Sequence, residues 1–155
     1  MGSLLEQIEQ SGVATWIREG GVLYGYPLIL FLHTFGLSTL VGLSSAINLR
    51  LLGFAPGIPL ASLARIFSLM WAGFALTAAT GILLFVSDAT RHASNPAFLL
   101  KLVFVALAVT ALALTWTRVF RGSHSGRILA AVSLACWFGA LSAGRLMAYI
   151  AEFVA

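Results

Sequence analysis

Charged residues are scarce in this chain of 155 residues. Only 9% of the residues are charged, whereas 60% are hydrophobic. Soluble domains usually carry about a quarter of charged residues, so the composition excludes an ordinary soluble protein and indicates a polytopic membrane protein. The basic residues are mostly single arginines between apolar runs, which excludes a nucleic-acid-binding surface. We therefore expect one membrane domain, with the lipid bilayer as its main partner.

The chain has only one cysteine and none of the familiar catalytic motifs. The single cysteine, Cys136, lies inside an apolar run, so no intramolecular disulfide can form and we interpret this residue as packing. The chain has no Walker loop, dinucleotide glycine fingerprint, metalloprotease helix or nucleophile elbow. Hydrolytic and nucleotide chemistry are excluded on this basis, and any enzymatic role would be that of an oxidoreductase component.

Long hydrophobic runs are what the chain has instead. The run Tyr24–Leu52 has no formal charge between Pro27 and Ile47. Crossing a hydrocarbon core of about 30 Å takes roughly 20 residues, so this run predicts a membrane-spanning helix. Residues 3–19 predict an amphipathic helix lying in the membrane surface, which Gly20 and Gly21 end. The four predicted spans cover about 24–52, 65–87, 98–119 and 128–151.

The connections between the spans are short, polar or rich in proline. They comprise residues 54–59, 88–96 and 121–126. Because short loops force neighbouring spans to run antiparallel, the expected fold is all-α, an up-down four-helix transmembrane bundle with an N-terminal amphipathic interfacial helix.

Lysine and arginine predict the orientation of the spans. One side holds Arg50, Arg65, Arg118, Arg121 and Arg127, whereas all five acidic residues lie on the opposite side. The positive-inside rule places the arginine-rich side in the cytoplasm. We therefore expect a multi-pass protein of the bacterial inner membrane with both termini in the periplasm.

Three polar groups are predicted at a similar depth in the outer half of the membrane. His33 lies roughly 9–13 Å from the outer end of the first span, and Arg145 lies roughly 9 Å from the outer end of the fourth. Lys101 lies near the outer start of the third span. The inner half has only Asn48 and Arg50, near the end of the first span. We interpret this asymmetry as the main functional signal, because polar groups inside a membrane are costly.

Each of these residues also has a purely structural interpretation. A neutral His33 could bond to a neighbouring helix. Lys101 and Arg145 could extend their side chains to the membrane surface. His92 could be a solvated residue of the 88–96 loop.

The functional interpretation makes His33 a ligand of haem iron or another metal, or a partner of a quinone carbonyl. His92 is the candidate for a second metal ligand, provided that its loop folds inward. A second copy of His33 from a homo-oligomer, or a five-coordinate iron, would also complete the site. Lys101 and Arg145 would face the haem propionates or another anionic group. The candidate cofactor-binding residues are therefore His33, His92, Lys101 and Arg145, and the candidate metal ligands are His33 and His92.

Several segments carry a resemblance to a known group of proteins. They are YPLILFLHTFGL with His33, NLRLLGF, TGILLF, NPAFLLK and AGRLMAY, in that order. Together they resemble a bacterial family of uncharacterised four-span membrane proteins, classed as a domain of unknown function. Asn48 stands where the family pattern would have an acid. More distantly, the layout is similar to the copper-resistance D and cytochrome b561-like membrane domains, which implies haem-mediated electron transfer or copper handling.

Three functional hypotheses follow. The first is a b-type haem protein for electron transfer, with a redox partner or quinone. The second is a transporter of a metal ion or small anion, which the apolar inner half and the lack of a methionine or cysteine ladder for copper disfavour. The third is a cofactor-free accessory subunit that assembles through the small residues of its spans.

Overall fold

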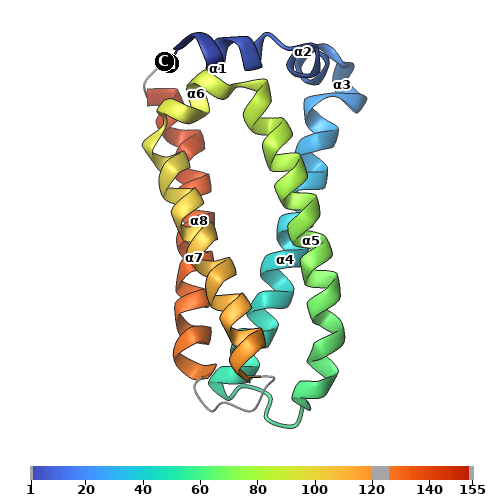
Figure 1. Ribbon diagram of the computed structural model, residues 1–155, viewed down its shortest axis with the longest axis vertical. Helices are drawn as coiled ribbons and strands as arrows, with labels where there is room; N and C mark the ends of the chain where they lie inside the picture. Colours follow the sequence, from blue (N-terminus) through green and yellow to red (C-terminus); the bar gives the residue numbers. More distant parts are fainter. Residues whose placement is uncertain (1, 120–125, 154–155) are drawn as a thin grey trace. The chain divides into compact units, whose positions relative to one another are not determined.

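The computed structural model describes residues 2–119 and 126–153, so Arg121 lies outside the described residues. The described residues are helical except for short connections, and none of them lies in a strand. The helices are α1 (Gly2–Glu9), α2 (Gly12–Glu19), α3 (Gly21–Tyr24), α4 (Tyr26–Leu52), α5 (Leu60–Ser87), α6 (Ala89–Ser94), α7 (Pro96–Val119) and α8 (Gly126–Phe153) (Figure 1). The all-α prediction is confirmed.

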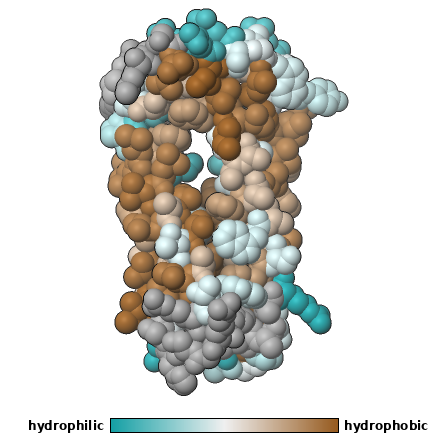
Figure 2. Space-filling view, viewed as in Figure 1, coloured by the Kyte–Doolittle hydropathy of each residue, from teal (hydrophilic) through white to brown (hydrophobic). Residues whose placement is uncertain are grey.

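Among the described residues, α4, α5, α7 and α8 are each long and apolar enough to cross a membrane. Large apolar side chains remain exposed along them, and brown apolar residues cover most of the visible face in Figure 2. Soluble proteins rarely expose so much contiguous apolar surface, whereas a bilayer covers it. The chain is therefore a multi-pass membrane protein, as predicted.

The N-terminal amphipathic segment differs from the prediction, because two short helices replace a single helix over 3–19. Ser11 separates them, since its hydroxyl accepts the backbone N–H of Ala14 at 3.3 Å and so caps the start of α2. The predicted break at Gly20 and Gly21 is confirmed. Gly21 has a φ of +80°, a backbone conformation that favours glycine.

Two other boundaries differ in an informative way. α5 begins at Leu60, directly after Pro59, and so extends the predicted second span toward its N-terminus. The Asp88–Pro96 connection contains α6 in place of an irregular loop. Asn95 and Pro96 then start α7, because the Asn95 side-chain oxygen accepts the backbone N–H of Ala97 at 2.9 Å and proline suits the first position of a helix.

The chain divides into two compact units, which α4 and α5 both run through. Unit 1 comprises the described residues of Met1–Leu40 and Ser68–Ser94. Within it, α4 and α5 come into close backbone contact at Gly36 and Gly73: a Cβ on Gly36 would lie only 3.0 Å from the Gly73 carbonyl oxygen. Small residues permit this backbone contact, which supplies packing where lipid gives no hydrophobic drive.

Unit 2 comprises the described residues of Val41–Phe67 and Asn95–Ala155, so all four long helices contribute to it. The ring of Phe67 on α5 packs on that of Trp116 on α7, with centroids 4.3 Å apart. The helices α7 and α8 pack along each other, with Phe104 lying against Gly139. Leu112 and Trp137 are fully buried in this unit. These contacts form the predicted four-helix bundle.

Candidate functional site

His33 lies on α4, and its ring contacts α5 within unit 1. The Nδ1 atom lies 3.1 Å from the backbone carbonyl oxygen of Thr77 and 3.1 Å from the Thr80 hydroxyl oxygen. A carbonyl oxygen can only accept, so Nδ1 must be the protonated nitrogen that donates to it. The lone pair of a neutral His33 is therefore on Nε2.

The groups around His33 reinforce this tautomer. The Thr80 hydroxyl donates to the Leu76 carbonyl oxygen at 2.6 Å, so toward His33 it acts as an acceptor. Gly81 leaves room for the ring, because a Cβ there would lie 3.2 Å from the His33 Cε1 atom. The half-buried imidazole is thus held in one orientation by residues 76–81 of a single neighbouring helix.

His92 lies on α6, also in unit 1, and its ring has the same tautomer. Its Nδ1 lies 2.7 Å from the Asp88 backbone carbonyl oxygen, and the ring contacts that of Phe85. Phe85 is one turn, roughly 6 Å, beyond Gly81 along α5. The structure thus places the two imidazoles against different turns of α5. That they share one metal stays a prediction.

Lys101 and Arg145 belong to unit 2. Lys101 packs on α8, where its Nζ lies 3.9 Å from the position of a Cβ on Gly144. Arg145 is exposed, and its guanidinium carbon lies 5.9 Å from the centre of the Tyr149 ring on the same helix. The structure therefore brings Lys101 beside the neighbour of Arg145. His33 belongs to unit 1, so the expectation that Lys101 and Arg145 lie near His33 stays a prediction.

Asp88, directly before α6, forms an ion pair within its own segment. Its carboxylate lies 3.6 Å from the guanidinium of Arg91, three residues further along the chain. Both side chains are solvent-accessible, so the pair contributes little to stability.

A buried polar network in unit 2 escaped the sequence analysis. The Asn48 amide nitrogen on α4 donates to the Ser133 hydroxyl on α8 at 2.9 Å, and lies 3.4 Å from the Ser44 hydroxyl. The Trp137 indole N–H donates to Ser44 at 2.8 Å. All four side chains are buried, and the Asn48 side-chain oxygen has no hydrogen-bond partner among the residues that the structure describes. The sequence analysis named Asn48 and Arg50 as the polar groups of this half of the membrane, and it therefore missed Ser44, Ser133 and Trp137.

The sequence did contain a signal for this network. Ser44 and Asn48 are four residues apart on one span, and Ser133 and Trp137 are four residues apart on another, so each pair shares a helix face. Whether those two faces meet depends on how α4 is rotated relative to α8. The residue spacing within either helix does not reveal that rotation. Buried Cys136 lies beside Trp137, in keeping with the predicted packing role.

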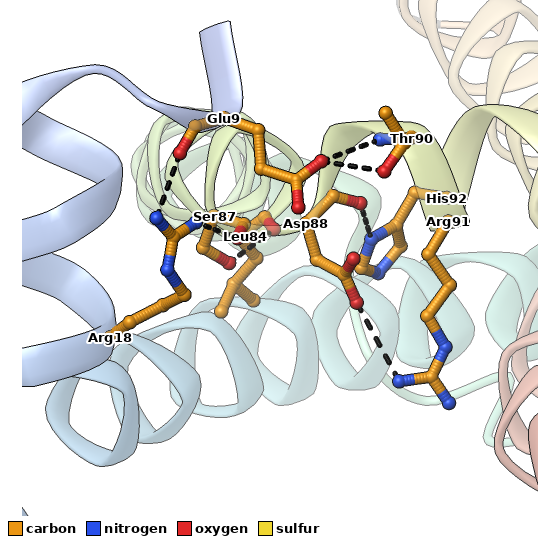
Figure 3. Close-up of polar contacts among 8 residues, drawn as sticks. All are labelled: Glu9, Arg18, Leu84, Ser87, Asp88, Thr90, Arg91 and His92. Carbon is orange, nitrogen blue, oxygen red and sulfur yellow. Dashed lines mark hydrogen bonds and ion pairs between the residues drawn. The ribbon is translucent and has the colours of Figure 1, made fainter. Parts of the chain in front are cut away.

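A third group of polar contacts anchors the N-terminal helices on α5 and α6 (Figure 3). Arg18 on α2 donates to the backbone oxygens of Ser87 at 2.8 Å and Glu9 at 2.9 Å. The Glu9 carboxylate on α1 accepts the Thr90 hydroxyl at 2.6 Å and the Thr90 backbone N–H at 3.2 Å. These Thr90 hydrogen bonds, helped by the Arg18 charge, lower the pKa of Glu9 below its ordinary value.

Clusters of histidine, cysteine and carboxylate side chains are the usual protein ligands of metal ions. Within residues 2–119 and 126–153, no three or more such side chains gather as a ligand set.

Comparison of the chain with protein-family models, curated proteins and solved structures finds no match. The resemblance to four-span membrane proteins therefore stays a prediction.

Proposed function

We propose that this membrane protein binds b-type haem through His33 and acts in electron transfer. The observation that supports the proposal most is the contact between His33 Nδ1 and the Thr77 carbonyl oxygen at 3.1 Å. Metal-binding histidines almost always donate their second ring N–H to a carbonyl, carboxylate or water, which fixes the ring and raises the basicity of the ligating nitrogen. The hydrogen bond of His33 Nδ1 fits this pattern.

The same tautomer separates two of the ligands considered for His33. A quinone carbonyl needs a hydrogen-bond donor, whereas the Nε2 atom of this neutral imidazole is an acceptor. Iron needs a nitrogen lone pair, which Nε2 supplies. The geometry thus favours an iron ligand over a partner of a quinone carbonyl.

Haem would supply one-electron redox chemistry, and the protein would supply the ligand, its orientation and an apolar surrounding. Thr77 and Thr80 hold the His33 ring, and Gly81 makes room for it. His92 is the candidate for a second ligand, because its Nδ1 also faces a backbone carbonyl. The proposal depends on His33 and requires neither Lys101 nor Arg145.

The test is a visible spectrum of protein purified from haem-replete cells, with bound haem measured per polypeptide. We expect a Soret band that His33→Ala abolishes while the helical circular-dichroism signal is retained. His124→Ala is the matched control, because it also removes one of the three histidines. Thr80→Val should weaken haem binding by about 10- to 100-fold, as loss of an outer hydrogen bond does at metal sites.

A colourless wild-type protein, or unchanged haem content in His33→Ala, would contradict the proposal. A colourless, metal-free protein that co-purifies with other membrane subunits would instead favour the accessory-subunit hypothesis.

A further inference from the structure

Two cationic side chains belong to the packed helices α7 and α8 of unit 2. Lys101 is in the second turn of α7, and its half-buried stem runs along Gly144, with Cδ 3.7 Å and Cε 3.8 Å from the position of a Cβ there. Arg145 follows Gly144 directly, so the two Cα atoms of α8 are about 3.8 Å apart. The missing side chain at position 144 thus brings the ammonium group of Lys101 beside the backbone that carries Arg145.

Neither cation has an acidic partner among the described side chains. The ion pair between Asp88 and Arg91 is the only one there, and it involves neither Lys101 nor Arg145. Both residues lie within helices that are long and apolar enough to span a membrane. Charged groups in such helices are costly unless an opposite charge or water reaches them. An anion from outside the described side chains would offset this cost.

The exposed face of α8 shows the chemical class of that anion. Phe138, Leu141, Arg145 and Tyr149 follow one another at spacings of three or four residues and so form one stripe. All four are exposed, and Phe138 retains 75% of its accessible surface. Two large apolar groups thus come first along the helix, then a cation, then a tyrosine. Apolar groups beside the acyl chains, followed by cationic and aromatic groups at the headgroup level, match the layers of a lipid leaflet.

We infer that Lys101 and Arg145 bind the phosphate of an anionic phospholipid, whose acyl chains lie along Phe138 and Leu141. A soluble phosphate would leave the exposed apolar side chains Phe138 and Leu141 uncovered, whereas the acyl chains of a phospholipid cover them. Arg145 forms directional hydrogen bonds with phosphate oxygens, and Lys101 adds a compact charge from the neighbouring helix. Tyr149, on which Arg145 lies, supplies the aromatic group typical of the membrane interface.

Native mass spectrometry of the full chain, purified in detergent with mixed phosphatidylglycerol and phosphatidylcholine, tests this inference. We expect wild-type protein to retain phosphatidylglycerol, and Lys101→Gln with Arg145→Gln to reduce that retention at least tenfold. Lys101→Arg should preserve it because the charge remains. Arg65→Gln is the matched control, since it removes one exposed cation from α5 and should leave retention unchanged.

Several outcomes would overturn the inference. One is equal retention of phosphatidylcholine and phosphatidylglycerol, and another is retention that Arg65→Gln reduces as much as the double substitution. A third is displacement of the lipid by millimolar inorganic phosphate, which would identify a site for free anions. Loss of haem in place of lipid in the double variant would assign the two cations to haem propionates. His33→Ala should leave lipid retention unchanged, so this inference and the haem proposal can fail separately.

Discussion

The polar residues of the two units hold their helices together in different ways. In unit 1 the His33 ring of α4 faces a backbone carbonyl of α5, next to a direct backbone contact at Gly36 and Gly73. In unit 2 the Asn48, Ser44, Ser133 and Trp137 side chains bond to one another between α4 and α8. Unit 1 thus presents a titratable ring in a fixed orientation, whereas unit 2 forms a network of neutral side chains.

These two arrangements suit different roles. The arrangement around His33 suits the proposed ligand site, and the network around Asn48 suits helix packing. A ring that donates to a carbonyl keeps a basic nitrogen for another ligand. A buried amide bonded to two hydroxyls carries no charge and fixes helix rotation, because any other rotation would leave more polar atoms unpaired. Only the first arrangement suits the proposed haem ligand, although both lie along the same helix, α4.

The largest effect is expected at the backbone contact of unit 1. Gly36→Ala would place a Cβ 3.0 Å from both the Gly73 oxygen and the Thr77 nitrogen, so the two helices must separate. We expect a loss of about 1–3 kcal/mol in the free energy of unfolding, measured by thermal or detergent unfolding. Gly42→Ala on the same helix is the control, because a Cβ there meets nothing within 4 Å. Equal effects of the two substitutions would show that helix propensity, and not the close contact, governs stability here.

A smaller effect is expected in the network of unit 2. Ser133→Ala removes the 2.9 Å acceptor of the Asn48 amide, and we expect it to cost about 1 kcal/mol in the same unfolding assay. Adding Asn48→Leu should recover part of this loss, since apolar groups leave no buried amide unpaired. Ser142→Ala on the exposed face of α8 should have no measurable effect. If the Ser133→Ala and Asn48→Leu double variant were less stable than Ser133→Ala alone, the Asn48 amide would have a role beyond its bond to Ser133.

The smallest effect is expected at the contact between α1 and α6 in unit 1. Because the folded state lowers the pKa of Glu9, this contact is fully stabilising at neutral pH. Its contribution should decline as pH falls below about 4.3, the ordinary glutamate pKa, and vanish once pH has passed the lower folded pKa. Hydrogen exchange of the α1 amides between pH 7 and pH 3 measures this loss. Glu9→Gln should flatten the pH dependence, whereas Glu6→Gln should preserve it, and the reverse result would assign the dependence to Glu6.

Much of the fold could be predicted from local signals. The spans were placed within a few residues because hydrocarbon thickness dictates their length, and the breaks at Gly20 and Pro59 follow from backbone geometry. The split at Ser11 and the helix within 88–96 were missed, because a cap or a short helix depends on local hydrogen bonds that weak periodicity does not reveal.

The sequence by itself determined that this protein is an α-helical membrane protein, and it singled out His33, since length and polarity suffice for both conclusions. Only the tertiary structure decided the tautomer of His33, the partners of Asn48 and the contact of Lys101 with Gly144. Each of these depends on how one helix is rotated and shifted against another. That choice is made by the packing of small residues and buried polar groups from distant parts of the chain, and no single helix contains it.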